Sequence, residues 1–222
     1  MALLDATPAL PAPALSRHLP LALVLLAAFV AVPLAGSDYL INAILLPFLA
    51  LSLAGLGLNL LTGYGGQLSL GSAAFMAVGA FAAYNLDLRL DGLPLPVTMI
   101  LAAATAAAVG LVFGIPSLRL RGYYLAVSTL AAQFFVQWAL TKFGWFSNHS
   151  ASGVISAPAL QVVGIGLDTT LGRYYLALVT VTLVTALVWR LVSGPEGANL
   201  IAVRDNETAA KVIGVPVLRT KL

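Results

Sequence analysis

The chain has 222 residues, of which 60% are hydrophobic and 9% are charged, and its formal net charge is +3. A water-soluble domain cannot cover that much apolar surface, and the absence of cysteine excludes disulfides and thiol-based zinc or redox sites. The apolar runs are near-continuous rather than alternating, so the sequence predicts an all-α, polytopic integral membrane protein with about six transmembrane helices. Lys and Arg residues lie at the ends of these runs, which favours a role in membrane topology over nucleic-acid binding.

The chain begins with residues 1–18, an unpatterned lead-in rich in Ala, Pro and Leu that we assign to the cytoplasm. The apolar run 19–36 follows, and it is either an uncleaved membrane anchor or a secretory signal peptide. It is long for a signal peptide and has no clear Ala-x-Ala cleavage site before Asp38, which favours the anchor. The second run, 39–62, is long enough to span a bilayer, and Pro47 can kink it.

A glycine-rich break separates the second and third predicted helices. The stretch from 58 to 79 reads LNLLTGYGGQLSLGSAAFMAVG and contains polar but no charged side chains. Gly63, Gly65 and Gly66 disfavour a helix, because each glycine costs about 1 kcal/mol relative to alanine in a helix interior. In lipid the freed backbone groups need partners, so the break is buried in protein or lines a wet cavity. It is therefore either a tight turn between two spanning helices or a discontinuity that lines a transport path.

Four further helices follow the break. In the second of them small residues recur at every fourth position, a spacing typical of close helix packing. Pro116 is expected to end that helix. The next helix has Gln133 and Gln137 one turn apart, so their side chains share a face that either bonds to a neighbouring helix or lines a path. The predicted helices span residues 67–86, 95–115, 123–141 and 173–192.

The distribution of positive charge predicts the topology. With six crossings and the N-terminus inside, eight Lys and Arg residues lie in the cytoplasm and three lie outside. This imbalance obeys the positive-inside rule and favours the break as a separation between two crossings. The loops that contain Asp91 and Ser152 are then outside. The inner set is Arg17, Arg119, Arg121, Arg190, Arg204, Lys211, Arg219 and Lys221, and the outer set is Arg89, Lys142 and Arg173.

The polar C-terminal tail leaves the membrane and contains a short predicted helix. Asp205 or Asn206 can cap its N-terminus, and Glu207 and Lys211 are spaced to pair within it. Gly214 can end it in the left-handed conformation. One flank is charged, and the other is a small apolar surface that suits a groove in a partner protein better than a lipid surface. That surface consists of Ala209, Ala210, Val212 and Ile213.

Three segments of the chain together resemble the signature segments of a known family. In chain order they read GLNLLTGYGGQLSLGSAAFMAVGA, GIPSLRLRGYYLAVSTLAAQFF and LIAVRDNETAAKVIGV. They resemble permease subunits of branched-chain amino acid ABC importers, the LivM type in particular, and the resemblance runs from Tyr39 to the last residue. Ser72 stands where many relatives have histidine. Leu222 stands where the family normally continues into further spanning helices, so we expect either a truncated chain or a truncated gene model.

The resemblance implies the partners and the coupling site. Members of the family pair two homologous permeases with two cytoplasmic ATPase subunits and a periplasmic or other extracytoplasmic solute-binding protein, in the lipid bilayer of the bacterial inner membrane. ATP is then bound by the ATPase subunits, and this chain, which has no phosphate-binding loop motif, is expected to need no cofactor of its own. The positions on the ATPase-contacting loop are Glu207, Ala209, Ala210 and Gly214.

We therefore predict a transmembrane permease subunit, without a catalytic or metal site, that imports branched-chain amino acids or related small amides or amino acids. The alternative is a secondary transporter or channel for a small polar solute, although the predicted helices lack the Asp, Glu or His that proton coupling usually needs. The predicted organisation is a lead-in at 1–18, a permease domain at 19–192 and an ATPase-coupling segment at 193–222. The predicted substrate path consists of Asn59, Gly63, Gly65, Gly66, Gln67, Ser69, Gln133 and Gln137.

Overall fold

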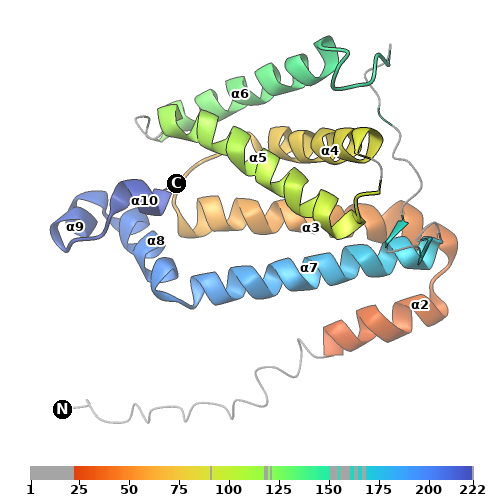
Figure 1. The fold of residues 1–222 in the computed structure, drawn as a ribbon. Coiled ribbons are helices and arrows are strands. Elements are labelled where there is room, and N and C mark those ends of the chain that lie inside the picture. The colour runs from red at the N-terminus through yellow and green to blue at the C-terminus, as the bar shows by residue number, and fades with distance from the viewer. Residues whose placement is uncertain are drawn as a thin grey trace, which may run out of the picture.

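The computed structural model describes residues 23–90, 92–117, 120, 122–150, 155, 161–162, 165–166 and 169–221. These residues form the helical membrane-protein fold drawn in Figure 1, which confirms the predicted all-α class. Two strands of two residues each, β1 (Gln161–Val162) and β2 (Ile165–Gly166), pair antiparallel in the long connection before the last membrane helix. The predicted lead-in, residues 1–18, lies outside the described residues.

The first two apolar runs form helices that contain π-helical turns. The second run extends two residues beyond its predicted end at residue 62. The α-helical part of the second run comes directly after a π-helical segment, and Pro47 is its second residue. The irregular helical segment therefore lies next to the proline, which cannot donate a backbone hydrogen bond. The first run comprises η1 (Ala27–Ala31) and α2 (Val32–Ala35), and the second comprises η2 (Leu40–Leu45), α3 (Leu46–Leu58) and η3 (Asn59–Tyr64).

The four helices after the break match the prediction except at some of their ends. Pro116 does not end its helix at residue 115, because the helix continues to Ser117, whose hydroxyl donates to the Gly114 carbonyl (2.7 Å) and closes the last turn. The last membrane helix begins three residues before residue 173, since the Thr169 side chain caps it by accepting from the Gly172 amide at 3.1 Å. The four helices are α4 (Ser72–Arg89), α5 (Leu95–Ser117), α6 (Tyr123–Lys142) and α7 (Thr170–Val192).

The third helix begins five residues later than predicted, because the break is longer than its glycines indicate. Gly66 has a φ of +64°, and the segment from there to Gly71 is not helical. Thr129 on α6 accepts a hydrogen bond from the Leu70 amide at 2.9 Å. The Ser69 hydroxyl accepts one from the Gly71 amide at 3.3 Å. Side chains therefore accept hydrogen bonds from backbone amides of this segment, which stays non-helical until Ser72 starts α4.

Three helical segments within the described residues are long and apolar enough to cross a membrane: Leu40–Tyr64, Leu95–Ser117 and Thr170–Val192. Leu23–Leu34 is a shorter apolar helix. Many large apolar side chains on these helices are exposed, which suits a surrounding of lipid rather than water. The chain is accordingly a polytopic membrane protein, and the number of six crossings stays a prediction.

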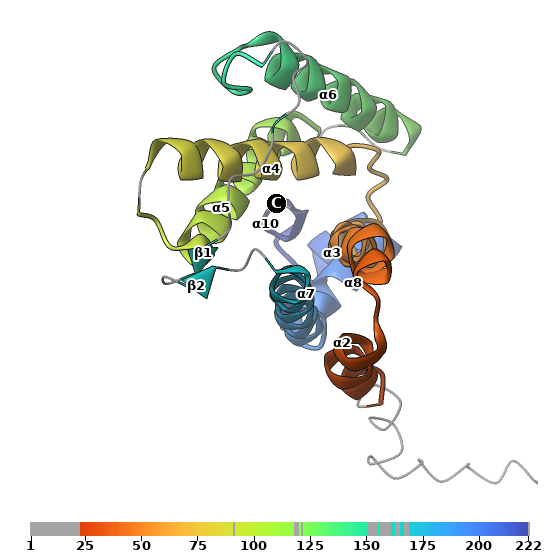
Figure 2. The ribbon, with the colours of Figure 1, turned by 90° about the vertical axis from the view of Figure 1, so that its right-hand side faces the viewer.

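The membrane helices pack in two groups, which Figure 2 shows from one end of the bundle. In one group, Ile41 and Leu49 pack against Tyr174 and Leu178 of α7. The hydroxyl of Tyr174 also donates to the Ala28 carbonyl in η1 at 2.8 Å, which joins the first apolar run to α7. In the other group, α4 and α6 share a core with side chains of α5. The buried residues of that second core are Ala74, Val78, Val136 and Leu140.

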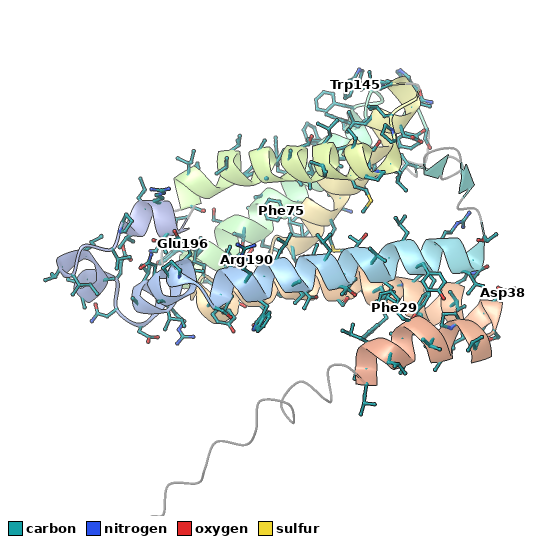
Figure 3. All side chains as sticks on the ribbon, turned by 60° about the horizontal axis from the view of Figure 1, so that its bottom comes forward. Phe29, Asp38, Phe75, Trp145, Arg190 and Glu196 are labelled. Atoms are coloured by element: carbon teal, nitrogen blue, oxygen red, sulfur yellow. The ribbon has the colours of Figure 1, made fainter. Side chains whose placement is uncertain are left out.

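Three short helices of the tail gather at one end of the bundle in Figure 1, and the β1–β2 pair lies at the other. Figure 3 places Arg190 and Glu196 at the tail end and Asp38 and Trp145 at the opposite end. The described members of the two predicted charge sets are divided in the same way, since Arg89 and Lys142 end α4 and α6. The tail helices are α8 (Pro195–Asp205), α9 (Glu207–Val212) and α10 (Val217–Lys221). Outside the described residues lie Arg17, Asp91, Arg119, Arg121 and Ser152.

Candidate functional site

The glycine break lies at the tail end of the bundle and contacts α8. Nη1 of Arg204 donates to the Gly63 carbonyl at 2.8 Å. The stem of the same arginine crosses Gly66 so closely that a Cβ there would lie 2.5 Å from its Cγ. Because Gly66 also has a φ of +64°, a side chain at this position is disfavoured by both backbone conformation and space. The break is thus a turn between α3 and α4, and the absence of side chains at its glycines lets Arg204 of the tail approach its backbone closely.

The segment that leaves the break packs on α6. The Thr129 hydroxyl accepts from the Leu70 amide at 2.9 Å and is within 2.9 Å of the Ala126 carbonyl, to which it donates. Gly71 is buried against the same turn, where an added Cβ would lie 3.2 Å from the Thr129 carbonyl oxygen. This close approach fixes the segment to α6 just before α4 begins.

A cavity of about 710 Å³ lies between α4, α5 and α6, where the segment after the break lines one side. Its wall is mostly apolar, and Phe75, which Figure 3 labels, is part of it. Lys221 at the end of α10 also lines the cavity, and its Nζ pairs with Glu207 at 2.9 Å. The uncharged polar residues of the wall are Gln67, Ser69, Ser117, Ser128, Thr129 and Gln133. The space can therefore hold a small solute with an apolar part and offers amides and hydroxyls to its polar part.

The predicted path residues separate into two groups. Gln67, Ser69 and Gln133 line the cavity. Gln137 is one turn further along α6 on its exposed side, and Asn59 is exposed with its side chain folded over Gly63. Gly63, Gly65 and Gly66 lie in the turn, where Gly63 and Gly66 contact Arg204, and do not line the cavity. The structure thus brings three members of the predicted set to the cavity wall, and the other five do not line it.

Sequence reasoning missed two residues that connect these parts. Thr129 precedes Gln133 by one helical turn, so the spacing already places them on one face and extends the Gln133–Gln137 pattern. Arg204 gave no such signal, because its partner Gly63 is 141 residues away in the chain. An arginine beside an aspartate in a polar tail is usually a solvated surface charge.

The tail forms the capped helix that the sequence predicts. Of the two candidate caps, Asn206 is the one used, and its Oδ1 accepts from the amides of Thr208 and Ala209 at 3.0 Å each. Glu207 pairs with Lys211 at 3.1 Å, as the spacing predicts. Gly214 has a φ of +88° and ends α9 in the left-handed conformation.

The tail has a small core of its own, which changes the predicted apolar surface. Ala210 is 1% exposed and packs with Val203 of α8 and Val217 of α10, so it belongs to the core and not to the surface. Val212 and Ile213 are 83% and 73% exposed, respectively. Of the predicted coupling positions, Ala209 and Gly214 are also exposed, and Glu207 is half-buried. These exposed positions leave one side of α9 open to a partner.

No group of His, Cys, Asp and Glu that could hold a metal ion occurs within the part of the chain that the structure describes. The described residues offer instead an apolar cavity, uncharged polar groups and Lys221 at its wall, and a capped tail helix joined to it through the glycine break.

Comparison with known proteins matches this chain to transport permease components. A family model described as "Branched-chain amino acid transport system / permease component" matches residues 40–222. The chain is 31% identical over 191 aligned residues to the "High-affinity branched-chain amino acid transport system permease protein LivM" of Salmonella typhimurium, and equally to that of Escherichia coli. Each alignment covers 76% of this chain and 44% of the relative, so the chain spans less than half the length of these relatives. No solved structure gives a significant match.

Proposed function

Since the chain belongs to the family of branched-chain amino acid transport permease components, we propose that it is a permease subunit of an ATP-binding-cassette importer that moves branched-chain amino acids, or related small amino acids or amides, into the cytoplasm. The observation that supports transport through this chain is the cavity between α4, α5 and α6. It is the place where predicted polar residues of the segment after the break and of α6 meet in the described structure.

The lining of the cavity suits an amino acid with a branched aliphatic side chain. Apolar and aromatic groups such as Phe75 and Phe113 make up most of the wall and can surround the side chain. The amides of Gln67 and Gln133 can bond to the ammonium and carboxylate groups without a full opposite charge. Such bonds stabilise a zwitterion only weakly, and a solute that is delivered by a binding protein must also be released again. We therefore place the substrate path along this wall.

The same proposal assigns the partners and the organisation of the chain. The permease domain, residues 19–192, would pair with a second homologous permease in the bacterial inner membrane and receive substrate from a solute-binding protein outside. The coupling segment, residues 193–222, would contact one of two cytoplasmic ATPase subunits, which bind the ATP. The exposed side chains of Val212 and Ile213 support this contact, because a helix side with large apolar groups and a charged flank suits a groove in a protein.

Single substitutions at three glutamines test the path. Gln133→Leu and Gln67→Leu, made in the full permease and expressed with its partners, should leave co-purification of the ATPase intact and lower ATP-driven uptake of leucine. Gln137→Leu is the matched control, since it removes the same group from the same helix one turn outside the cavity. Loss of assembly in Q133L, or equal loss of uptake in Q133L and Q137L, would remove the cavity from the path. Uptake that follows an ion gradient and ignores ATP would instead identify a secondary transporter.

A further inference from the structure

The three tail helices are held together as one unit. Val203, Ala210 and Val217 come one each from α8, α9 and α10, and they form a buried cluster. Glu207 reinforces it, because its two carboxylate oxygens pair with Lys211 in the same helix and Lys221 in α10, at 3.1 and 2.9 Å. A force applied to α9 would therefore move α8 and α10 with it.

Apart from a long hydrogen bond from the Gln67 side-chain amide to the Lys221 carbonyl of α10 (3.5 Å), two sets of contacts among the described residues tie this unit to the membrane helices. The first is the turn between α7 and α8, where Gly197 packs directly on the backbone of Val192, so closely that a Cβ would overlap it. The second is Arg204 on the glycine break. Its guanidinium is oriented by the adjacent Asp205, which accepts from Nε at 2.9 Å while Nη1 donates to the Gly63 carbonyl at 2.8 Å. The first contact follows from chain connectivity, whereas the second joins residues that are distant in sequence.

The break is in turn attached to the wall of the cavity. Four residues after Gly66, the Leu70 amide donates to the Thr129 hydroxyl on α6. Thr129 lines the cavity, and Gln133 follows it one helical turn later on the same wall. A displacement of the break can therefore reach the polar part of the cavity through one short non-helical segment and the hydrogen bond from Leu70 to Thr129.

From these contacts we infer that Arg204 is a positioning residue for transport: it transmits movement of the tail to the glycine break, and through Thr129 to the cavity wall. This rests on the proposed function, in which an ATPase moves the tail. Gly66 is the residue of the break that Arg204 contacts most closely. Only a residue without a side chain fits beneath the arginine stem at its φ of +64°. The break then serves as a joint between the coupling segment and the cavity, in addition to separating two crossings.

The test compares Arg204→Ala and Arg204→Lys with Arg219→Ala in the full transporter complex, reconstituted with its ATPase and binding protein. Arg219 is an exposed arginine of the same tail, so its substitution controls for loss of positive charge. We expect R204A to keep ATPase co-purification and ATP hydrolysis while leucine uptake per ATP falls about three- to tenfold, the factor that corresponds to one partly exposed charge-assisted hydrogen bond. R204K, which retains a single donor, should fall between R204A and wild type, and R219A should match wild type.

A merely structural arginine would behave differently. Assembly, ATP hydrolysis and uptake would then fall in parallel in R204A. If R204A did not assemble at all, R204K would be the informative variant, and a structural role would give the same parallel loss there. Either result, or unchanged uptake per ATP in R204A, overturns the inference.

Gly66→Ala tests the contact from the side of the break, and it should lower uptake per ATP as R204A does. The double variant should show no further loss of uptake per ATP. Multiplied losses in the double variant would mean that the two residues act independently and would also overturn the inference. An inactive wild-type complex would refute the proposed function instead.

Discussion

Gly214→Val tests the coupling segment at the residue whose backbone conformation ends α9. The amides of Gly214 and Val215 donate to the carbonyls of Lys211 and Ala210 at 3.1 and 3.0 Å, the paired bonds of a Schellman ending, and Gly214 holds a φ of +88°. Apart from its two chain neighbours, no atom lies within 4 Å of the position a Cβ would take. The main cost of a substitution is therefore that of a side chain on a left-handed backbone.

A β-branched residue in that conformation costs about 1–3 kcal/mol. At about 2 kcal/mol the native ending of α9 is disfavoured about 30-fold relative to wild type. With only six residues, α9 has little helical stability of its own to offset this, so the tail unit should open. We expect ATP-driven uptake to fall strongly, together with either loss of ATPase co-purification or hydrolysis that is no longer coupled to uptake.

The matched variant is Gly214→Asn, because asparagine adopts the left-handed conformation far more readily than valine. It should retain most of the uptake. Trypsin cleavage after Lys211 in membranes gives a readout that does not depend on transport, and it should be faster in G214V than in G214N. Normal coupling and cleavage in G214V, or equal damage in both variants, would refute the reasoning from backbone conformation.

Four further predictions follow from other parts of the molecule. Asn206→Ala removes the two cap hydrogen bonds of α9 and should destabilise the tail by about 1 kcal/mol, measured as faster tryptic cleavage there; cleavage at the wild-type rate would show that the cap is dispensable. Thr129→Val frees the Leu70 amide and should lower uptake more than Thr129→Ser, which keeps the hydroxyl, with assembly as the control. Cysteines introduced at Asp91 and Ser152, in a chain without native cysteine, should react with an impermeant reagent from outside, and labelling only from the cytoplasm would reverse the topology. The 222 residues alone in liposomes should show no saturable amino acid uptake, because the proposed path requires a second permease subunit.

Local patterns predicted most of the helices and the end of the tail. Apolar length located α5, α6 and α7 to within a few residues at each end. Cap chemistry predicted α9, where Asn206, Glu207 and Gly214 act as their positions indicate. These features depend on residues within one or two turns of each other, and such interactions are visible in the sequence alone.

Features that depend on distant partners were not predictable in the same way. The start of α4 was wrong by five residues because Thr129, 59 residues further on, accepts the Leu70 amide. α8 was missed, since a polar segment with two glycines near its start has little helical signal before it packs. The predicted path set mixed residues of the cavity with residues of the break, because polarity within an apolar stretch does not reveal whether a group faces a solute or another helix.

The position of the break resolves what its glycines do. A discontinuity that bound substrate near the middle of a bilayer would leave backbone carbonyls open toward a cavity. Here the Gly63 carbonyl is taken by Arg204, the Leu61 carbonyl accepts from the Gln67 amide at 3.1 Å, and Gly66 lies beneath the arginine stem. The freed groups are thus partly satisfied by the tail, which meets the requirement that backbone polar groups in a membrane protein find partners. Under the proposed function, glycines that let the tail approach the break this closely would give movement of the tail a direct route to the helices around the cavity.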